Sequence, residues 1–420
     1  MLTRSLLPLL LLFAATPAAA QNDSMAMPPL PSDPAPAQAT TQPQPVTKAQ
    51  PAMAAPVAGD WNREQAGALL AYIDRIGEEG LDPADYDRDG LRRAIEARGE
   101  TLDRVATAVF LSVASDLMFG HVRGDARIDW YIEDDSWNVY DQQALLNRAL
   151  AGGAIAETLN TLLPTHPQYA ALKALLAAPT TDAAFRDQIR INLERWRWLP
   201  RDLGQKYVIS NVPAYMVALV ENGNVISRRR SVAGATKTPT PQLNATITGA
   251  ILNPWWEVPM SIAPEVRGKK GYVRVAAGEG KWRYRQPPGP ANALGRAKLV
   301  MPNPHAIYLH DTNAQGLFNR QQRAFSHGCI RTEDALGFFG DLLAGTEWTP
   351  EKIKATVASG KTVQANTAAP IPVYIVYFTV ATTGDAPGYV AYKDLYGRDG
   401  KVLAALKDRG NTALASAGGN

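Results

Sequence analysis

The chain contains a single cysteine, Cys329, among its 420 residues. One cysteine cannot form an internal disulfide, so the fold must be stabilised in another way. Net charge is also low, because 43 basic residues against 40 acidic ones leave a balance of only +3. So small an excess of positive charge is not typical of nucleic-acid binding, and we expect no nucleic-acid partner.

Long apolar runs are scarce as well, and the clearest one stands at the start of the chain. Arg4, the apolar residues 6–13 and the small residues 18–20 predict a cleaved export signal over residues 1–20. This run is too short to span a membrane, and we expect no later segment to cross a bilayer. We therefore expect a periplasmic protein. A lone cysteine in such a protein is either an inert core residue or a reactive thiol.

Composition and periodicity change along the chain and predict its domain order. Residues 21–59 are rich in Pro, Ala, Gln and Thr, which predicts a disordered linker. Apolar residues then recur at helical spacing and predict a mostly helical domain over residues 60–180. A period of 2 follows, so residues 181–410 are predicted to form a mainly β domain, with a flexible tail at 411–420. The fold class is α+β.

Two segments allow both a functional and a purely structural interpretation. Residues 261–295 are rich in Gly, Lys and Arg and contain three aromatic residues, and we interpret this long connection as a lid over a substrate. Residues 85–96 match the spacing of a calcium loop. Gly80 and Pro83 interrupt any helix that would enter this loop, and Arg92 stands where such loops carry an aliphatic residue. We therefore interpret the segment as a polar turn before a helix with an acidic first turn.

The residues around Cys329 favour a reactive thiol. A thiol attacks as the thiolate, and its pKa near 8.5 calls for a neighbouring base or cation. His310 ends a predicted strand nineteen positions earlier, so the fold must bring it to the cysteine. Gly328 permits a tight turn, and we expect the N–H groups of Gly328 and Cys329 to be free to face an oxyanion. Arg331 supplies a cation that can bind a carboxylate or hold the thiolate.

A metal site is the alternative use of these residues. His310, His327 and Cys329 offer three ligands, but the spacing is not one that zinc sites use and the chain has no second cysteine. We therefore rank a nucleophile above a metal, and we expect neither a metal nor another cofactor.

Two short motifs carry a resemblance to a known family. Residues 307–311 (IYLHD), followed by residues 326–331 (SHGCIR), resemble the signature of the YkuD-type catalytic domain of L,D-transpeptidases. Further blocks at residues 195–200, 253–259 and 287–295 resemble the large YcbB-type subgroup. The resemblance implies a YkuD-like β-sandwich with an inserted lid, preceded by a helical scaffold domain.

The resemblance also implies roles for individual residues. Cys329 is the implied nucleophile and His310 its base, oriented by the backbone carbonyl of Asp311. The backbone of Gly328 and Cys329, with the hydroxyl group of Tyr308, is the implied oxyanion hole. The residues implied to shape the pocket or support the imidazoles are His327, Arg331, Ser326 and Trp256. From the residues alone, Tyr308 is equally well a plain strand aromatic, Arg331 an ion-pair partner, and Trp256 a core or wall residue.

The implied activity is peptidoglycan cross-linking. Cys329 would attack the third residue of a tetrapeptide stem, release D-Ala, and pass the acyl group to a second stem as a 3-3 cross-link. Water or a free D-amino acid as acceptor, cleavage of a wall linkage, and a wall-binding scaffold without turnover are the alternatives. The implied partners are peptidoglycan stem peptides, with β-lactams of the carbapenem class as covalent inhibitors. Larger members of the subgroup carry a separate peptidoglycan-binding module between the helical scaffold and the catalytic domain. Here Leu176 is followed almost directly by Phe185, which leaves no room for such a module at that place.

Overall fold

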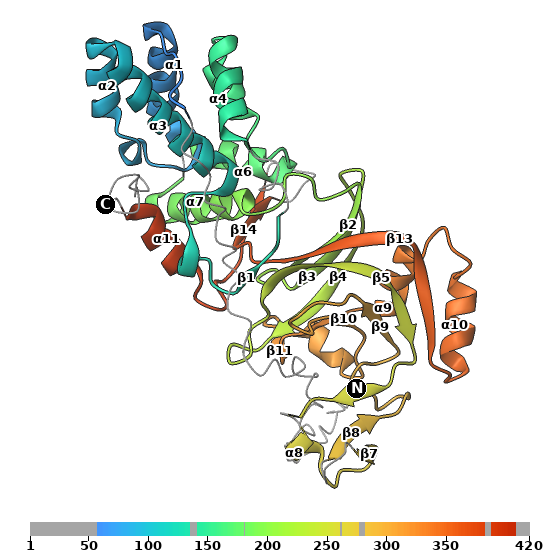
Figure 1. Cartoon of the computed structure of the whole chain (residues 1–420). Coiled ribbons are helices and arrows are strands. Elements are labelled where there is room, and N and C mark those ends of the chain that lie inside the picture. The colour runs from blue at the N-terminus through green and yellow to red at the C-terminus, as the bar shows by residue number, and fades with distance from the viewer. Residues whose placement is uncertain are drawn as a thin grey trace, which may run out of the picture.

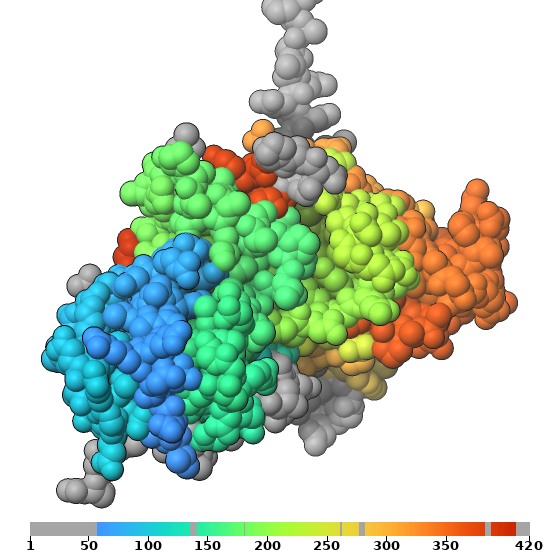
Figure 2. Space-filling model, turned by 90° about the horizontal axis from the view of Figure 1, so that it is seen from above, coloured from blue at the N-terminus to red at the C-terminus, as the bar shows by residue number. Residues whose placement is uncertain are grey.

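The computed structural model describes residues 57–134, 141–179, 181–260, 263–276, 282–382 and 388–408 (Figure 1). The predicted export signal, the linker up to residue 56 and the predicted tail lie outside the described residues. Figure 2 shows the blue-to-green helical half of the chain lying against the yellow-green and orange β half.

The first half is helical, as predicted. Its helices are α1 (Arg63–Asp74), α2 (Arg88–Ala97), α3 (Gly99–Phe119), α4 (Gln142–Ala151), α5 (Ile155–Asn160) and α6 (Pro167–Ala177), with short 3-10 turns at Ile76–Glu79, Pro83–Asp85 and Gly124–Ala126. The apolar face of α1 packs with α3 around the fully buried Leu69 and Phe110. Burial of these faces, more than helix propensity, holds such helices in place.

Helix α3 corrects one expectation. We expected no segment after the N-terminus to be long and apolar enough to cross a membrane, but residues 99–126 pass that test by length and composition. Most of this stretch is buried inside the protein, where Val113 and Leu117 are fully covered by neighbouring helices. The apolar character of α3 is therefore explained by its place at the centre of the helical domain.

The segment with calcium-loop spacing is a turn followed by a helix. The side chain of Asp87 accepts a hydrogen bond from Gly90 N–H at 3.0 Å and so caps α2, and Asp89 lies in the first turn of that helix. Asp82 caps the preceding 3-10 turn by accepting from Ala84 N–H at 3.0 Å. The polar-turn interpretation is confirmed by these caps.

Helix α7 (Ala183–Arg197) joins the two halves. The sequence predicts an amphipathic helix over residues 182–198 that ends at Pro200, and the helix does begin after the cap residue Asp182 and end before Pro200. The amphipathic pattern is wrong for its second half, where every residue from 191 to 197 is buried. This burial has a structural reason, because α7 contacts four other elements: α3, α6, α11 (Asp399–Lys407) and β14 (Val380–Thr382). Charged residues in this half must therefore be paired inside the protein.

The second half is mainly β, and its principal sheet closes on itself. Its strands are β2 (Lys206–Asn211), β3 (Met216–Glu221), β4 (Asn224–Gly234), β5 (Gln242–Leu252), β9 (Ala297–Val300), β10 (Leu309–His310), β11 (Ala324–Ser326), β12 (Ile330–Thr332) and β13 (Val363–Val376). The pairing runs β5-β13-β2-β3-β4-β12-β10-β9, and β9 pairs again with β5. Because β5 and β9 are hydrogen-bonded to each other, the two layers expected of a sandwich belong to one closed sheet.

Several boundaries differ from the sequence prediction. The sequence predicts a strand over residues 374–380, but β13 begins at Val363, because its first part pairs with β5 in a second register. A strand was not expected in the helical half, yet β1 (Trp130–Tyr131) adds to the edge of β5 in parallel. A helix is predicted over residues 334–343, and α9 (Ala335–Leu342) confirms it. Helix α10 (Pro350–Ala358) and the pair β14 (Val380–Thr382) and β15 (Tyr389–Ala391) complete the domain.

The segment interpreted as a lid contains regular structure of its own. Strand β8 (Trp282–Gln286) pairs with β7 (Val273–Ala276) on one side and with β6 (Trp256–Val258) on the other, in a separate three-stranded sheet beside α8 (Ala263–Val266). Figure 1 shows this sheet projecting from the lower end of the principal sheet. Its strands were not predicted because the segment is rich in charge and glycine. Covering of a substrate stays a prediction.

Candidate active site

Two short parallel strands bring the motif residues together. Strand β10 pairs with β12 in the register Leu309↔Ile330 and His310↔Arg331, and Ile330 N–H donates to Tyr308 O at 3.0 Å. Side chains alternate along each strand, so Leu309 and Ile330 lie on one face of the sheet. The opposite face carries the motif side chains Tyr308, His310, Cys329 and Arg331. Their neighbourhood follows from the register, although His310 and Cys329 are distant in sequence.

The His310 ring is oriented by the backbone. Its Nδ1 atom lies 2.5 Å from the carbonyl oxygen of Asp311, the contact that the resemblance implied. A carbonyl oxygen only accepts, so Nδ1 carries the proton and Nε2 is the basic nitrogen. The ring is fully buried and lies edge-on to Tyr308, with ring centroids 5.9 Å apart. The arrangement holds one tautomer of His310 in one orientation.

The Asp311 side chain fixes the carbonyl that orients His310. Its Oδ2 accepts from Arg296 N–H at 2.8 Å, and its Oδ1 accepts from the Gln315 amide at 3.0 Å. Gly295 has φ +62, and a Cβ there would lie 2.5 Å from Asp311 Cγ. The last residues of the predicted lid segment are therefore packed directly against Asp311.

The turn before Cys329 is held by Ser326 and corrects an expectation. Ser326 Oγ donates to Cys329 O at 2.5 Å and accepts from Gly328 N–H at 3.1 Å. From the sequence we expected the Gly328 N–H to be free to face an oxyanion, but in the structure it is bonded to Ser326. The hydroxyl group of Ser326 is only two residues away and accepts this backbone N–H in a local hydrogen bond. The tight turn itself is confirmed, because Gly328 has φ +112, which favours glycine.

The thiol itself lies under this turn. Cys329 is fully buried, and its Sγ lies 3.7 Å from the carbonyl oxygen of Ala306. Ser326 and Arg331 are also buried, whereas His327 is half-buried. Trp256 is fully buried on β6, with its ring centroid 6.1 Å from that of Tyr272, which places it in the core beneath the small sheet. The roles assigned to these side chains stay predictions.

Similarity to known families agrees with this geometry. Residues 205–364 match the family model described as the L,D-transpeptidase catalytic domain, and residues 58–176 match the model described as a scaffold domain. The chain carries an L,D-transpeptidase catalytic domain. These matches fall within the two halves of the fold and leave α7 between them.

Individual relatives are more distant. A curated protein of Haemophilus influenzae, provisionally named an L,D-transpeptidase, is 28% identical over 255 residues, which cover 54% of this chain and 51% of the relative. The chain thus spans about half the length of this relative.

Among solved structures, two mycobacterial proteins are similar. The L,D-transpeptidase from Mycobacterium smegmatis is 11% identical, covering 41% of this chain and 58% of the other, with a TM-score of 0.22. The Mycobacterium tuberculosis L,D-transpeptidase 3, solved with a faropenem-derived adduct, is also 11% identical, covering 41% and 60%, with a TM-score of 0.22. Similarity this low does not extend to details of the site.

The turn before Cys329 in the L,D-transpeptidase domain is also supported by residues from distant parts of the chain. Thr240 Oγ1 donates to Gly328 O at 2.8 Å, and the Thr240 carbonyl accepts from Arg398 at 3.1 Å. Arg398 is buried and pairs with Asp129 at 2.6 Å. Sequence reasoning missed these supports, because Asp129 and Arg398 are far from the motif in sequence. Asp129 lies next to β1, so the helical half contributes to this support.

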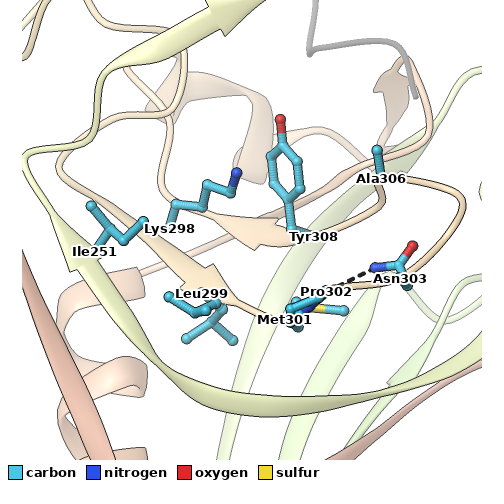
Figure 3. A pocket seen from close by; sticks show the side chains of 9 residues that line it. Ile251, Lys298, Leu299, Met301, Pro302, Asn303, Ala306 and Tyr308 are labelled. Atoms are coloured by element: carbon cyan, nitrogen blue, oxygen red, sulfur yellow. Dashed lines mark hydrogen bonds between the residues drawn. The ribbon is translucent and has the colours of Figure 1, made fainter. Parts of the chain in front are cut away.

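Sequence reasoning also missed Lys298. It lies on β9 opposite His310, and its Nζ is 3.6 Å from the ring centroid of Tyr308. Lys298 and Tyr308 line a cavity of about 250 Å³ that also reaches Ala306 (Figure 3). One signal was available in the sequence: a lysine interrupts an otherwise apolar strand, AKLV.

Replacing Gly328 by alanine is expected to slow acylation of Cys329 by about a hundredfold. Alanine rarely adopts φ +112, and its Cβ would lie 3.0 Å from Ile307 Cδ1, so the turn must shift. Displacements of ~1 Å at a reacting group cost rates of about this size. Mass spectrometry of the acyl-enzyme formed with a carbapenem measures the rate. Gly316→Ala is the control, because nothing surrounds a Cβ there. Equal rates for Gly328→Ala and the intact protein would show that the turn tolerates a side chain.

Proposed function

We propose that this domain forms 3-3 peptidoglycan cross-links in the periplasm, with Cys329 as the acyl carrier. The observation that supports this most is the register of β10 and β12, which places His310 and Cys329 on one face of adjacent strands. The hydrogen bond from Nδ1 to Asp311 O makes Nε2 of His310 the base. A buried thiol beside an oriented imidazole has the composition that nucleophilic acyl transfer requires.

The reaction proceeds in two steps. The Cys329 sulfur attacks the carbonyl carbon of the third stem residue, and the thiol proton passes to His310. The C–N bond to the terminal D-Ala then breaks, and the proton on His310 goes to the leaving amine. In the second step an amine of another stem attacks the thioester and gives a proton to His310. The C–S bond then breaks, and His310 passes that proton to the Cys329 sulfur.

Oxyanion stabilisation is assigned to two groups of the motif. The Cys329 N–H and the Tyr308 hydroxyl are the donors proposed to meet the developing charge. The Gly328 N–H is not among them, because it is bonded to Ser326. Peptidoglycan stem peptides are the proposed substrates, and carbapenems the proposed covalent inhibitors of the same thiol.

Incubation with disaccharide-tetrapeptides tests the proposal. The expected product is a 3-3 dimer with release of D-Ala, detected by mass spectrometry, and it is expected to be absent for Cys329→Ala. Tripeptide without dimer would assign the enzyme to hydrolysis. Absence of any product, together with absence of an adduct on Cys329 after exposure to a carbapenem, would contradict an acyl-transfer function.

A further inference from the structure

A fully buried thiol needs more help to ionise than an exposed one. Burial in apolar surroundings raises the pKa of a thiol, while adjacent cations lower it. Cys329 has no exposed surface and packs within the principal core of the β domain. Cations on the Cys329 side of the sheet therefore have a direct effect on how much thiolate is present.

The register of β9 puts a lysine on that side. Lys298 lies directly opposite His310 in the antiparallel pair β9–β10, and the bond from Asp311 N–H to Ala297 O at 2.8 Å fixes this register. Side chains of directly opposed residues stand on the same face. The Lys298 side chain therefore shares its face with His310, and so with Tyr308 and Cys329.

Contacts agree with this placement. The Lys298 ammonium lies over the Tyr308 ring at 3.6 Å from its centroid, and Tyr308 stands level with Cys329 across the two parallel strands. Figure 3 shows the amino end of Lys298 beside that ring, above a cavity floor formed by apolar side chains. Ala306, whose carbonyl oxygen is near Cys329 Sγ, lines the same cavity.

We propose that Lys298 is the cation that stabilises the Cys329 thiolate, acting on the nucleophile through its charge. This inference rests on the proposed function only in taking Cys329 as the nucleophile. The other motif residues near Cys329 are His310 on β10, Tyr308 directly before that strand, Arg331 on β12, and His327 in the turn. Lys298 differs from all of them in coming from β9, on the far side of His310.

The electrostatic effect of Cys329 on Lys298 agrees with this pairing. Burial lowers the pKa of Lys298, and the negative charge of Cys329 opposes this by raising it. Such coupling is reciprocal: a thiolate that favours the protonated lysine is favoured by it to the same extent. No other charged group in the described part of the chain contributes to the pKa shift of Lys298.

The single cysteine makes a reagent-free test possible. The ultraviolet absorbance of the thiolate is titrated between about pH 5 and pH 10. Subtraction of the same titration of Cys329→Ala removes the contribution of the tyrosines. In Lys298→Met the thiol pKa is expected to rise by about one unit, leaving roughly tenfold less thiolate near neutral pH. Lys298→Arg is expected to retain the original curve. Lys354→Met, on the exposed side of α10, is the matched control.

Three results would overturn the inference. One is a thiol titration in folded Lys298→Met that superimposes on that of the intact protein. Another is a raised KM for the tetrapeptide with an unchanged thiol titration, which would make Lys298 a binding group for a substrate carboxylate. If Lys298→Met does not fold, Lys298→Gln is titrated instead, and an unchanged curve there is equally decisive. The titration uses no substrate, so its result does not depend on whether the protein forms the proposed cross-links.

Discussion

Acylation of Cys329 is expected to fall by about 10²–10⁴-fold when His310 is replaced by alanine. In the proposed mechanism the imidazole is the base that takes the thiol proton, and its tautomer is held by the Asp311 carbonyl at 2.5 Å. Alanine removes the basic nitrogen altogether. The rate of adduct formation with a carbapenem, followed by intact-protein mass spectrometry, measures the effect.

A second variant separates chemistry from packing. His310 is fully buried, so alanine also leaves a cavity, whereas His310→Gln keeps most of the volume and still lacks a base. Both variants are expected to be slow. His166→Ala, in the helical half, is the control and is expected to acylate normally. If His310→Gln acylates at the rate of the intact protein, His310 is not the base.

The largest expected effect on stability comes from Glu194 in α7. Its carboxylate accepts from Val122 N–H at 2.7 Å and from the Trp198 indole at 2.8 Å, and it pairs with Arg197 at 2.7 Å. Both members of the ion pair are fully buried. Glu194→Ala leaves the Arg197 charge without this partner, which typically costs about 3–5 kcal/mol of unfolding free energy.

Urea unfolding measures this loss. Glu96→Ala is the control, because Glu96 is exposed on α2 and its replacement is expected to change the unfolding free energy by less than about 0.5 kcal/mol. Comparable midpoints for the two variants would mean that the buried pair contributes little.

The pH dependence of the unfolding free energy tests the Glu194–Arg197 pair independently. Burial alone would raise the pKa of Glu194, but the charge of Arg197 and the bonds from Trp198 and Arg197 lower it from 4.5 to about 2. A lowered folded-state pKa gives stability that is present above pH 4.5 and is lost as the pH falls towards 2. Glu194→Gln is expected to lack this part of the acid dependence.

The sequence predicted those features that rest on local pattern. Helix α7 begins at its capping aspartate and stops before Pro200, and the turn between β3 and β4 falls at Asn222 and Gly223, both with positive φ. These features follow from propensities that act within a few residues. The juxtaposition of His310 and Cys329 was expected from the motif, and the parallel register explains it.

Features set by distant contacts were not predictable in this way. Strand β1 forms only because the edge of β5 is there to receive it, and two residues carry no periodicity. The Gly328 N–H was expected to be free, since nothing in the sequence weighs a hydrogen bond to Ser326 against one to a substrate. Lys298 reaches the site through closure of the sheet at β9, which pairs with both β5 and β10.

The buried Arg398 links the support of the turn before Cys329 to the order in which the chain is synthesised. Cys329 and its turn are translated before Arg398 and before Tyr396, whose hydroxyl group donates to Gly234 O at 2.7 Å. Until this late segment folds back, Thr240 lacks its bond from Arg398, and Thr240 is what holds the Gly328 carbonyl. The turn before Cys329 therefore takes part of its support from a segment that is translated after it, and the hydrogen bonds from Arg398 through Thr240 to Gly328 are complete only once that segment has folded back.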